Sequence, residues 1–379
     1  MSYLTYEHLR VIWWLLLGVL LIGFAVTDGF DLGTGILLPF VAKTDGERRV
    51  VLNTVGPVWE GNQVWLILGG GAIFAAWPLV YAVAFSGFYL AMLLVLCALI
   101  LRPAGFKYRS KLEAPRWRET WDWLLFVGGL VPALIFGVAV GNALLGAPFT
   151  FDDSLRMTYH GTLFGLLTPF ALLCGLVSVA MLTMHGGAWL AVKTEGRIAA
   201  RARTATLYAA LVLIVLFALA GLWVSHLDGY QIVGTLAHDA ASNPLGKTVT
   251  RKAGQWLANY RAQPWTILAP LLGFGGAALA ILASRAHLAI GAFLASSLSV
   301  VGVVATAGLS LFPFLLPSST DPSASLTVWD ASSSQTTLLI MLIATLIFVP
   351  IILAYTSFIY AVLRGKVTEK KVEADHFSY

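Results

Sequence analysis

Two carboxyl groups lie inside the first long apolar stretch of this sequence. Asp28 and Asp31 are three residues apart in the segment TDGFDLG (27–33), so a helix that continues through this segment would place them on neighbouring positions of one face. An Asp near the centre of a bilayer costs about 2.5 to 3.5 kcal/mol, and such residues usually face protein or water. The pair is therefore typical of an ion path or of a counter-charge to a cofactor.

More polar side chains stand at the ends of the next apolar segments. Glu60, Asn62 and Gln63 begin the second segment, Arg102 ends the third, and Asp122 begins the fourth. A series of carboxyl and amide groups is what proton uptake into a membrane requires, and Arg102 would keep some of the carboxylates ionised. The sequence predicts that four carboxyl groups lie at one level and face Arg102: Asp28, Asp31, Glu60 and Asp122.

A purely structural interpretation of the same residues stays open. Asp122 suits a helix N-terminus, and Arg102 could extend its guanidinium group to the membrane surface. This interpretation is weaker for Asp28, Asp31 and Glu60 together, because two of them lie within an apolar run. Glycines at positions 29, 33 and 35 would let neighbouring helices approach closely.

The elements that must position these groups are membrane helices. Hydrophobic residues make up 58% of the 379 residues, charged residues make up 11%, and the mean hydropathy is +0.82. Crossing an apolar core takes roughly 20 residues of helix, because a helix satisfies its own backbone groups in lipid. We expect an all-α polytopic membrane protein with one transmembrane domain, residues 1–379. Nine spans are predicted, near residues 11–36, 58–77, 79–101, 121–142, 161–184, 204–226, 264–284, 288–314 and 336–363.

The basic residues give these spans an orientation. Of the 24 Lys and Arg residues, 18 fall in alternate loops and in the C-terminal tail. The positive-inside rule then places the N-terminus in the periplasm and the C-terminus in the cytoplasm, with a long periplasmic loop at 227–263. An even number of spans would break this alternation, so residues 58–101 must turn, and Trp77-Pro78 supplies a break. The net charge of +5 is thus an orientation signal, and we expect no binding of nucleic acid.

The sequence offers little for redox chemistry or for a metal site. A haem held between helices needs a His or Met deep in a span, and Met92 alone is more typical of packing. No P-loop, HExxH, CxxC or nucleophile elbow occurs, and Cys97 and Cys174 are expected to be buried thiols. The seven histidines are expected at the outer ends of the spans (His8, His160, His226 and His238) or at the inner side (His185, His287 and His376).

Several motifs occur together along nearly the whole chain. They include IWW (12–14), TDGFDLG (27–33), WEGNQVW (59–65), FAAWP (74–78), FSGFY (85–89), SNPL (242–245) and FPF (312–314). In this order they closely resemble subunit II of the cytochrome bd quinol oxidase family. That resemblance implies a nine-helix subunit paired with a subunit I that carries two b-type haems, one d-type haem and the quinol site.

The resemblance also implies an activity and further partners. The complex would be an electrogenic terminal oxidase of the bacterial inner membrane that oxidises quinol, reduces dioxygen to water and takes protons from the cytoplasm. A small single-helix accessory subunit and a structural quinone in this chain are further implications. This chain would not be catalytic alone.

Particular residues take roles from the same resemblance. Positions linked to the integrity of the haem sites correspond to Asp31, Trp59, Arg102 and Asp122. The position of Glu60 is linked to a proton path along the subunit interface, and the polar level predicted above adds Asp28, Asn62 and Gln63 to that path. The family often has His-Trp-Asp-Gly where this chain has VWEG (58–61), so the carboxyl group lies one methylene further from the backbone and no imidazole can relay protons at Val58.

Three hypotheses follow from the sequence. The first is the non-haem subunit of a quinol oxidase, which contributes a proton path and a platform for the haem subunit. The alternative is a secondary transporter or an ion-coupled membrane subunit, since acidic residues in membranes also bind coupling ions. A third is a scaffold in which the acidic residues serve only as caps and ion pairs.

Overall fold

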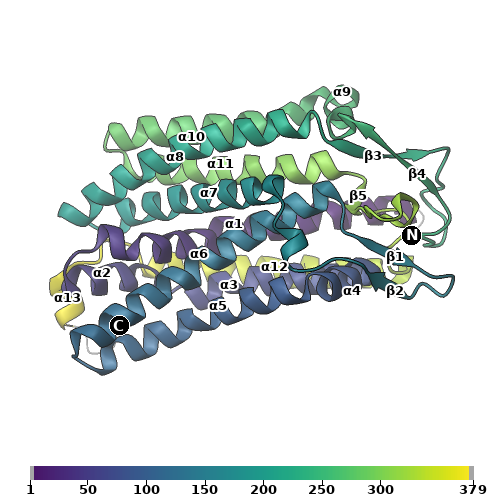
Figure 1. Ribbon diagram of the computed structural model, residues 1–379. Coiled ribbons are helices and arrows are strands. Elements are labelled where there is room, and N and C mark those ends of the chain that lie inside the picture. Colours follow the sequence, from purple (N-terminus) through teal and green to yellow (C-terminus); the bar gives the residue numbers. More distant parts are fainter. Residues whose placement is uncertain (1–3, 375–379) are drawn as a thin grey trace.

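The computed structural model of this chain describes residues 4–374, and its main feature is a bundle of long helices that run side by side (Figure 1). The long helices are α1 (Tyr6–Val41), α3 (Trp59–Ala76), α5 (Tyr89–Tyr108), α6 (Pro115–Leu145), α7 (Pro169–Lys193), α8 (Gly196–Val224), α10 (Leu268–Arg285), α11 (Ala289–Leu311) and α12 (Gln335–Val362). The shorter helices are α2 (Asp45–Val55), α4 (Pro78–Gly87), α9 (Ala258–Ala262) and α13 (Glu369–Ala374). The predicted helical membrane fold is confirmed.

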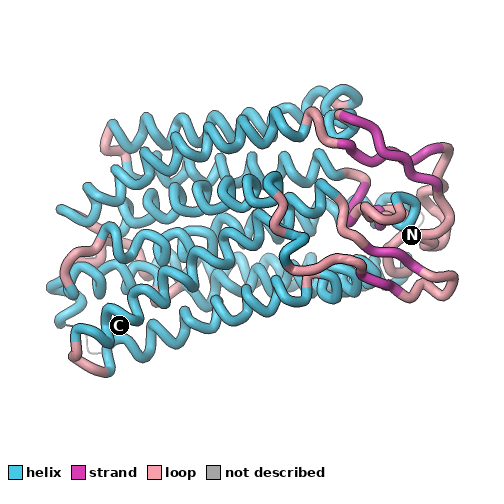
Figure 2. Tube along the Cα trace, in the orientation of Figure 1, coloured by secondary structure: helices cyan, strands magenta, loops and turns pink. Residues whose placement is uncertain are grey.

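Three small antiparallel hairpins stand at one end of the bundle, which is called the strand end below (Figure 2). They pair β1 (Phe149–Phe151) with β2 (Met157–Tyr159), β3 (Asp228–Val233) with β4 (Thr248–Ala253), and β5 (Phe314–Leu316) with β6 (Leu326–Thr327). The loop expected at 227–263 therefore contains a hairpin, and two further hairpins accompany it. Helices α2 and α13 lie at the opposite end, called the α13 end (Figure 1).

Eight helices within residues 4–374 are long and apolar enough to cross a membrane. Helix α3 has 18 residues and is not among them, because its polar start at Glu60, Asn62 and Gln63 lowers its hydropathy. The count of nine spans, the orientation and the single-domain division stay predictions. Helix α3 ends at Ala76 and α4 begins at Pro78, which is the break that Trp77-Pro78 predicts.

Several predicted spans differ from the structure in their bounds, and two of them show the physical reason. The span expected from residue 161 begins at Pro169, because Pro favours the first helical position and the Thr168 hydroxyl accepts a hydrogen bond from the Ala171 N–H. The span expected at 79–101 is interrupted at Phe88 and then continues as α5 to Tyr108, with Pro103 inside the helix. Helix α5 therefore includes Lys107, which lies beyond the predicted end of the span at residue 101.

Helix α1 is the element around which the site is built. It packs against α3, α6 and α7. The crossing with α7 requires glycine, because a Cβ atom added to Gly33 would overlap the Leu182 carbonyl oxygen, and one added to Gly186 would overlap the backbone of Gly33. The close approach predicted for the glycines of α1 therefore holds α1 and α7 together beside Asp31.

Candidate functional site

Polar side chains from four helices meet in a buried group that we call the inner cluster: Asp28 and Asp31 of α1, Asn62 of α3, Arg102 of α5 and Tyr360 of α12. Arg102 and the two Asp residues are each at most 3% exposed. The Arg102 guanidinium group donates to both carboxylate oxygens of Asp28, at 2.9 and 2.7 Å. Its Nη2 atom also lies 3.8 Å from Asp31 Oδ2. This fork geometry makes Asp28 the main partner of Arg102.

Asn62 and Tyr360 extend the inner cluster. The Asn62 amide donates to Asp31 Oδ2 at 2.8 Å, and the Tyr360 hydroxyl donates to Asn62 Oδ1 at 2.6 Å. Trp59 packs beside them, with its ring centroid 5.9 Å from the Arg102 guanidinium carbon. Sequence reasoning missed Tyr360, because no motif links a residue near the end of α12 to the start of α3.

The inner cluster holds more carboxyl groups than cations. With both Asp residues ionised, its net charge would be −1. Asp31 Oδ1 and Thr34 Oγ1 are buried without a hydrogen-bond partner among the described residues, and both residues border a cavity of about 10 Å³. That volume is near the smallest that holds one water molecule.

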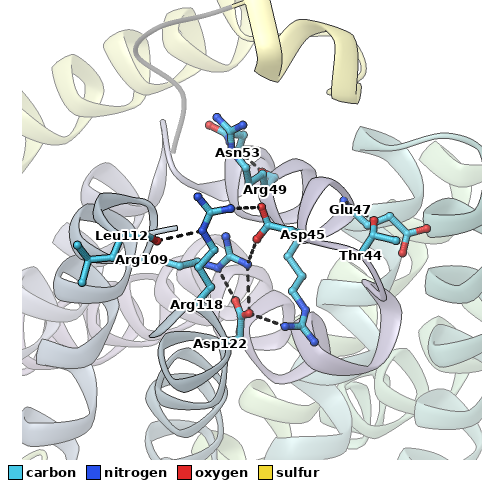
Figure 3. Close-up of polar contacts among 10 residues, drawn as sticks. Thr44, Asp45, Glu47, Arg49, Asn53, Arg109, Leu112, Arg118 and Asp122 are labelled. Carbon is cyan, nitrogen blue, oxygen red and sulfur yellow. Dashed lines mark hydrogen bonds and ion pairs between the residues drawn. The ribbon is translucent and has the colours of Figure 1, made fainter. Parts of the chain in front are cut away.

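Asp122 belongs to a second group at the α13 end, called the edge cluster (Figure 3): Asp45 and Arg48 of α2, Arg109, and Arg118 and Asp122 of α6. Asp122 accepts from Arg109 Nε at 2.6 Å and from Arg48 Nη1 at 2.8 Å. Asp45 lies 2.9 Å from Arg109 and 2.5 Å from Arg118. The expectation that Asp122 faces Arg102 is therefore wrong, because the extension of α5 past Pro103 brings Arg109 to its level instead.

Glu60 also departs from the predicted arrangement. Its side chain is exposed, whereas Asn62, two residues later, is 1% exposed. Positions two apart on a helix point about 200° apart, so they cannot both face the inner cluster. Gln63, which is intermediate in exposure, follows Glu60 by three residues on its outward side, while Trp59 and Asn62 share the inward side. This spacing was readable in the sequence.

Comparisons with known proteins agree on a family. The sequence profile described as "Cytochrome bd terminal oxidase subunit II" matches residues 9–363. The chain is 52% identical to "Cytochrome bd-I ubiquinol oxidase subunit 2" of Escherichia coli, over 99% of each chain. It belongs to the cytochrome bd terminal oxidase subunit II family.

Other relatives extend this match. "Probable cytochrome oxidase subunit 2" of Haemophilus influenzae is 49% identical, over 99% of each chain. The solved structure of the bd oxidase from Geobacillus thermodenitrificans matches 94% of this chain and 98% of its own, with a TM-score of 0.62 and 15% identity, which is a likeness of fold. As a member of the family, the chain is a subunit of a terminal oxidase, an oxidoreductase complex, and a multi-pass protein of the bacterial inner membrane with subunit I as its partner.

The family implies haem cofactors in the complex, and the buried His185 of this subunit does not fit a haem ligand. His185 lies inside α7 and is fully buried, deeper than the sequence indicated. Its Nδ1 atom lies 2.8 Å from Ser296 Oγ, and its Nε2 atom lies 2.8 Å from Val26 O. Both ring nitrogens thus have protein partners, and neither is free to bind iron. Within residues 4–374, no group of three or more His, Cys, Asp or Glu side chains could hold a metal ion.

An apolar cavity of about 610 Å³ opens between α1, α6, α7, α8, α10 and α11. Phe24, Phe136 and Phe217 line its walls, and Tyr260 and Arg261 are among its few polar residues. The Tyr260 hydroxyl is 2.9 Å from Ser310 Oγ. Its volume and apolar lining are those of a site for a large apolar molecule.

Proposed function

We propose that this chain is the non-haem subunit of a cytochrome bd-type quinol:O2 oxidoreductase that gives the haem-bearing subunit I a platform and a path for protons from the cytoplasm. Two b-type haems and one d-type haem would be held by subunit I, where quinol is oxidised and dioxygen is reduced to water. The name of the E. coli relative favours ubiquinol as the electron donor. A small single-helix accessory subunit would complete the complex.

The exposed carboxyl group of Glu60 carries the proton-path proposal. Glu60 stands at the start of α3 and points out of the chain. On the same side, seven and fourteen residues further on, Ile67 is 70% exposed and Phe74 is 60% exposed. A carboxyl group beside such an apolar stripe is costly in lipid, and a partner subunit over this stripe would remove it from hydrocarbon. Glu60 would then deliver protons at the interface, with Gln63 next to it.

The inner cluster supports the same path from the other side of α3. Asn62, on the inward side of α3, donates to Asp31, and one water molecule in the 10 Å³ cavity would connect Asp31 with Thr34. Because two carboxyl groups share one Arg, this cluster can take up a proton without losing its main ion pair. We propose that it adjusts its charge when a proton passes Glu60.

We further propose that the 610 Å³ cavity holds a structural quinone. The apolar walls would contact the isoprenoid tail, and Arg261 would donate to a quinone oxygen. The Tyr260 hydroxyl, which donates to Thr306 O at 3.2 Å, would donate to the quinone only by turning away from that oxygen. Solvent extraction of the purified complex and quantification of quinone should give more quinone than the catalytic site alone accounts for.

The decisive experiment compares E60Q with E119Q in the complete oxidase. Both changes remove one exposed carboxyl group near the α13 end, and Glu119 lies on α6 outside the proposed path. We expect E60Q to lower quinol-driven oxygen consumption by about 100-fold, the lower end of the range that removal of a proton-transfer group costs. The haem absorbance spectrum should be retained, and E119Q should behave as the wild type.

The same measurements separate this function from the alternatives. Wild-type turnover of E60Q would remove the proton role. Failure of E60Q, D28N and D31N to assemble with the haem subunit, in place of slow turnover, would favour the scaffold. Family membership does not favour the secondary transporter, and ion uptake by this chain alone in liposomes would be needed to restore it.

A further inference from the structure

A large cavity at the α13 end shares only Tyr360 with the inner cluster and no residue with the edge cluster. Its volume is about 1240 Å³, and it is bounded by the end of α7, the start of α11, the end of α12 and the segment 363–372. The end of α2, with Asn53 and Thr54, and the turn that follows it, with Pro57 and Val58, also line the cavity. Its size exceeds the roughly 300 to 1,000 Å³ of a typical small-molecule site, which suits a long molecule.

The charged residues that line this cavity are all basic. They are Lys193, Arg364, Lys366 and Lys371, with His287 beside them, and no Asp or Glu is among the lining residues. Within residues 4–374, none of the three lysines has a carboxylate oxygen within 4.0 Å. Lys193 is only 9% exposed. A buried ammonium group without a counter-charge is costly, so the cavity favours an anion.

The three lysines are held in place and still have donors to spare. Lys193 Nζ donates to Leu363 O at 2.6 Å, Lys366 Nζ to Thr194 O at 3.0 Å, and Lys371 Nζ to Lys366 O at 3.1 Å. The Val367 N–H donates back to Lys193 O at 2.8 Å. Each ammonium group has three N–H donors, so each has donors left for a ligand.

The other walls of the cavity are apolar and reach the membrane face of the bundle. Leu288 and Ile290 at the start of α11 are 61% and 67% exposed, and Val362 at the end of α12 is 63% exposed. Ile290 and Val362 belong to helices that are apolar enough to span a membrane, and Leu288 directly precedes one of them. A ligand could thus place an anionic group on the lysines and apolar chains between α11 and α12.

We propose that this cavity binds an anionic phospholipid, whose phosphate contacts Lys193, Lys366 and Lys371 and whose acyl chains follow Ile290 and Val362. Basic pockets between membrane helices at the cytoplasmic side are suited to anionic headgroups, and the proposed orientation places the α13 end in the cytoplasmic leaflet. The lipid would supply the counter-charge that the described chain lacks and would join the end of α7 to the segment that follows α12.

The test is native mass spectrometry of the complete oxidase complex, titrated with phosphatidylglycerol or with phosphatidylcholine of the same chains. The wild type should retain phosphatidylglycerol more tightly than phosphatidylcholine. K371Q removes one exposed charge and should weaken phosphatidylglycerol binding about fivefold, and K193Q/K371Q should weaken it about 25-fold. K370Q removes a neighbouring exposed lysine that does not line the cavity and should bind as the wild type.

Three results would overturn the proposal. The first is that the wild type retains the two lipids equally. Retention of neither lipid, as expected if a protein partner fills the cavity, counts as the same result. The second is unchanged phosphatidylglycerol binding in K371Q, a variant that leaves the buried Lys193 in place and is expected to fold. The third is displacement of the lipid by millimolar glycerol 1-phosphate or inorganic phosphate, which would make the site one for a soluble anion. None of these depends on the turnover of E60Q, so the two proposals fail separately.

Discussion

The inner cluster and the edge cluster use the same two kinds of charged side chain in opposite proportions. In the inner cluster two Asp residues share one Arg, whereas in the edge cluster two Asp residues are surrounded by three Arg residues. The first group is buried between helices within the bundle, and the second fastens α2 to the ends of α5 and α6 (Figure 3).

This difference separates two tasks of a charged group in a membrane protein. A cluster with an excess of carboxyl groups can accept a proton and keep its ion pair, as a proton path requires. A cluster with an excess of Arg stays charged at any physiological pH, because Arg does not lose its proton in proteins. The inner cluster is therefore suited to changes of charge, and the edge cluster to holding helices together.

The largest effect is expected for R102Q. It leaves two buried carboxyl groups without their cation, and breaking a buried pair in this way costs about 3 to 5 kcal/mol. We expect a loss of assembled, haem-containing complex, measured by size-exclusion chromatography with haem absorbance. R118Q is the control, because Arg118 pairs with Asp45, whose side chain is 42% exposed, and such a pair contributes at most about 1 kcal/mol. Equal yields for R102Q and R118Q would contradict the distinction between the clusters.

The next effect distinguishes the two carboxyl groups of the inner cluster. D28N removes the charge that both Arg102 nitrogens contact and should cost about 3 kcal/mol. D31N should cost about 1 kcal/mol, because Arg102 keeps its main partner and Asp31 Oδ1 has none among the described residues. Thermal unfolding of the purified complexes would measure both. A larger loss for D31N than for D28N would mean that Asp31, as the family resemblance implies, is the structural one.

A smaller effect is expected within the edge cluster. D122N removes a 1% exposed carboxylate that Arg48 and Arg109 contact and should lower stability by about 2 kcal/mol, the range of hydrogen bonds to charged groups. D45N, at a half-exposed side chain, should lower it by less than about 1 kcal/mol. Oxygen consumption per assembled complex should stay unchanged in both. A fall in turnover at full assembly would give the edge cluster a part in the proton path.

The sequence predicted part of the inner cluster and did not predict the edge cluster, for physical reasons. The residue types and the predicted ends of the spans were enough to predict that Asp28 pairs with Arg102, because a buried carboxyl group needs a cation at its own depth. Asp122 was assigned to the wrong Arg, because Pro103 was taken as the end of a helix that in fact continues through it for five more residues. Seven residues from Arg102 to Arg109 correspond to about two helical turns.

Other parts of the site differ in how far the sequence could predict them. Two faces of α3 were readable from spacing, with Trp59 and Asn62 on one side and Glu60 on the other. The Tyr360 contact was not readable, because it depends on where α12 packs, 298 positions after Asn62 in the sequence. No local pattern carries that information.

The smallest effect concerns pH, and it extends the comparison to a carboxyl group outside the spans. Glu47 of α2 accepts from the Lys43 N–H at 2.6 Å and from Arg201 at 2.7 Å. Partial burial alone would raise the pKa of Glu47, but these contacts outweigh it and hold the pKa below its ordinary value of 4.5. A carboxyl group whose pKa is depressed by folding stabilises the protein above its unfolded pKa, and this contribution is lost as the pH falls through the folded pKa.

We therefore expect the melting temperature of the wild type to fall more steeply than that of E47Q between pH 5 and values below 4.5. At pH 7, E47Q should be less stable by about 0.5 kcal/mol, as for other surface pairs, and the two proteins should converge in acid. Scanning fluorimetry across this range, with E119Q as a control that keeps the wild-type profile, measures the difference. If E47Q and the wild type lose stability in parallel, the acid sensitivity lies in other carboxyl groups, and α2 is fastened to the bundle by the edge cluster without help from Glu47.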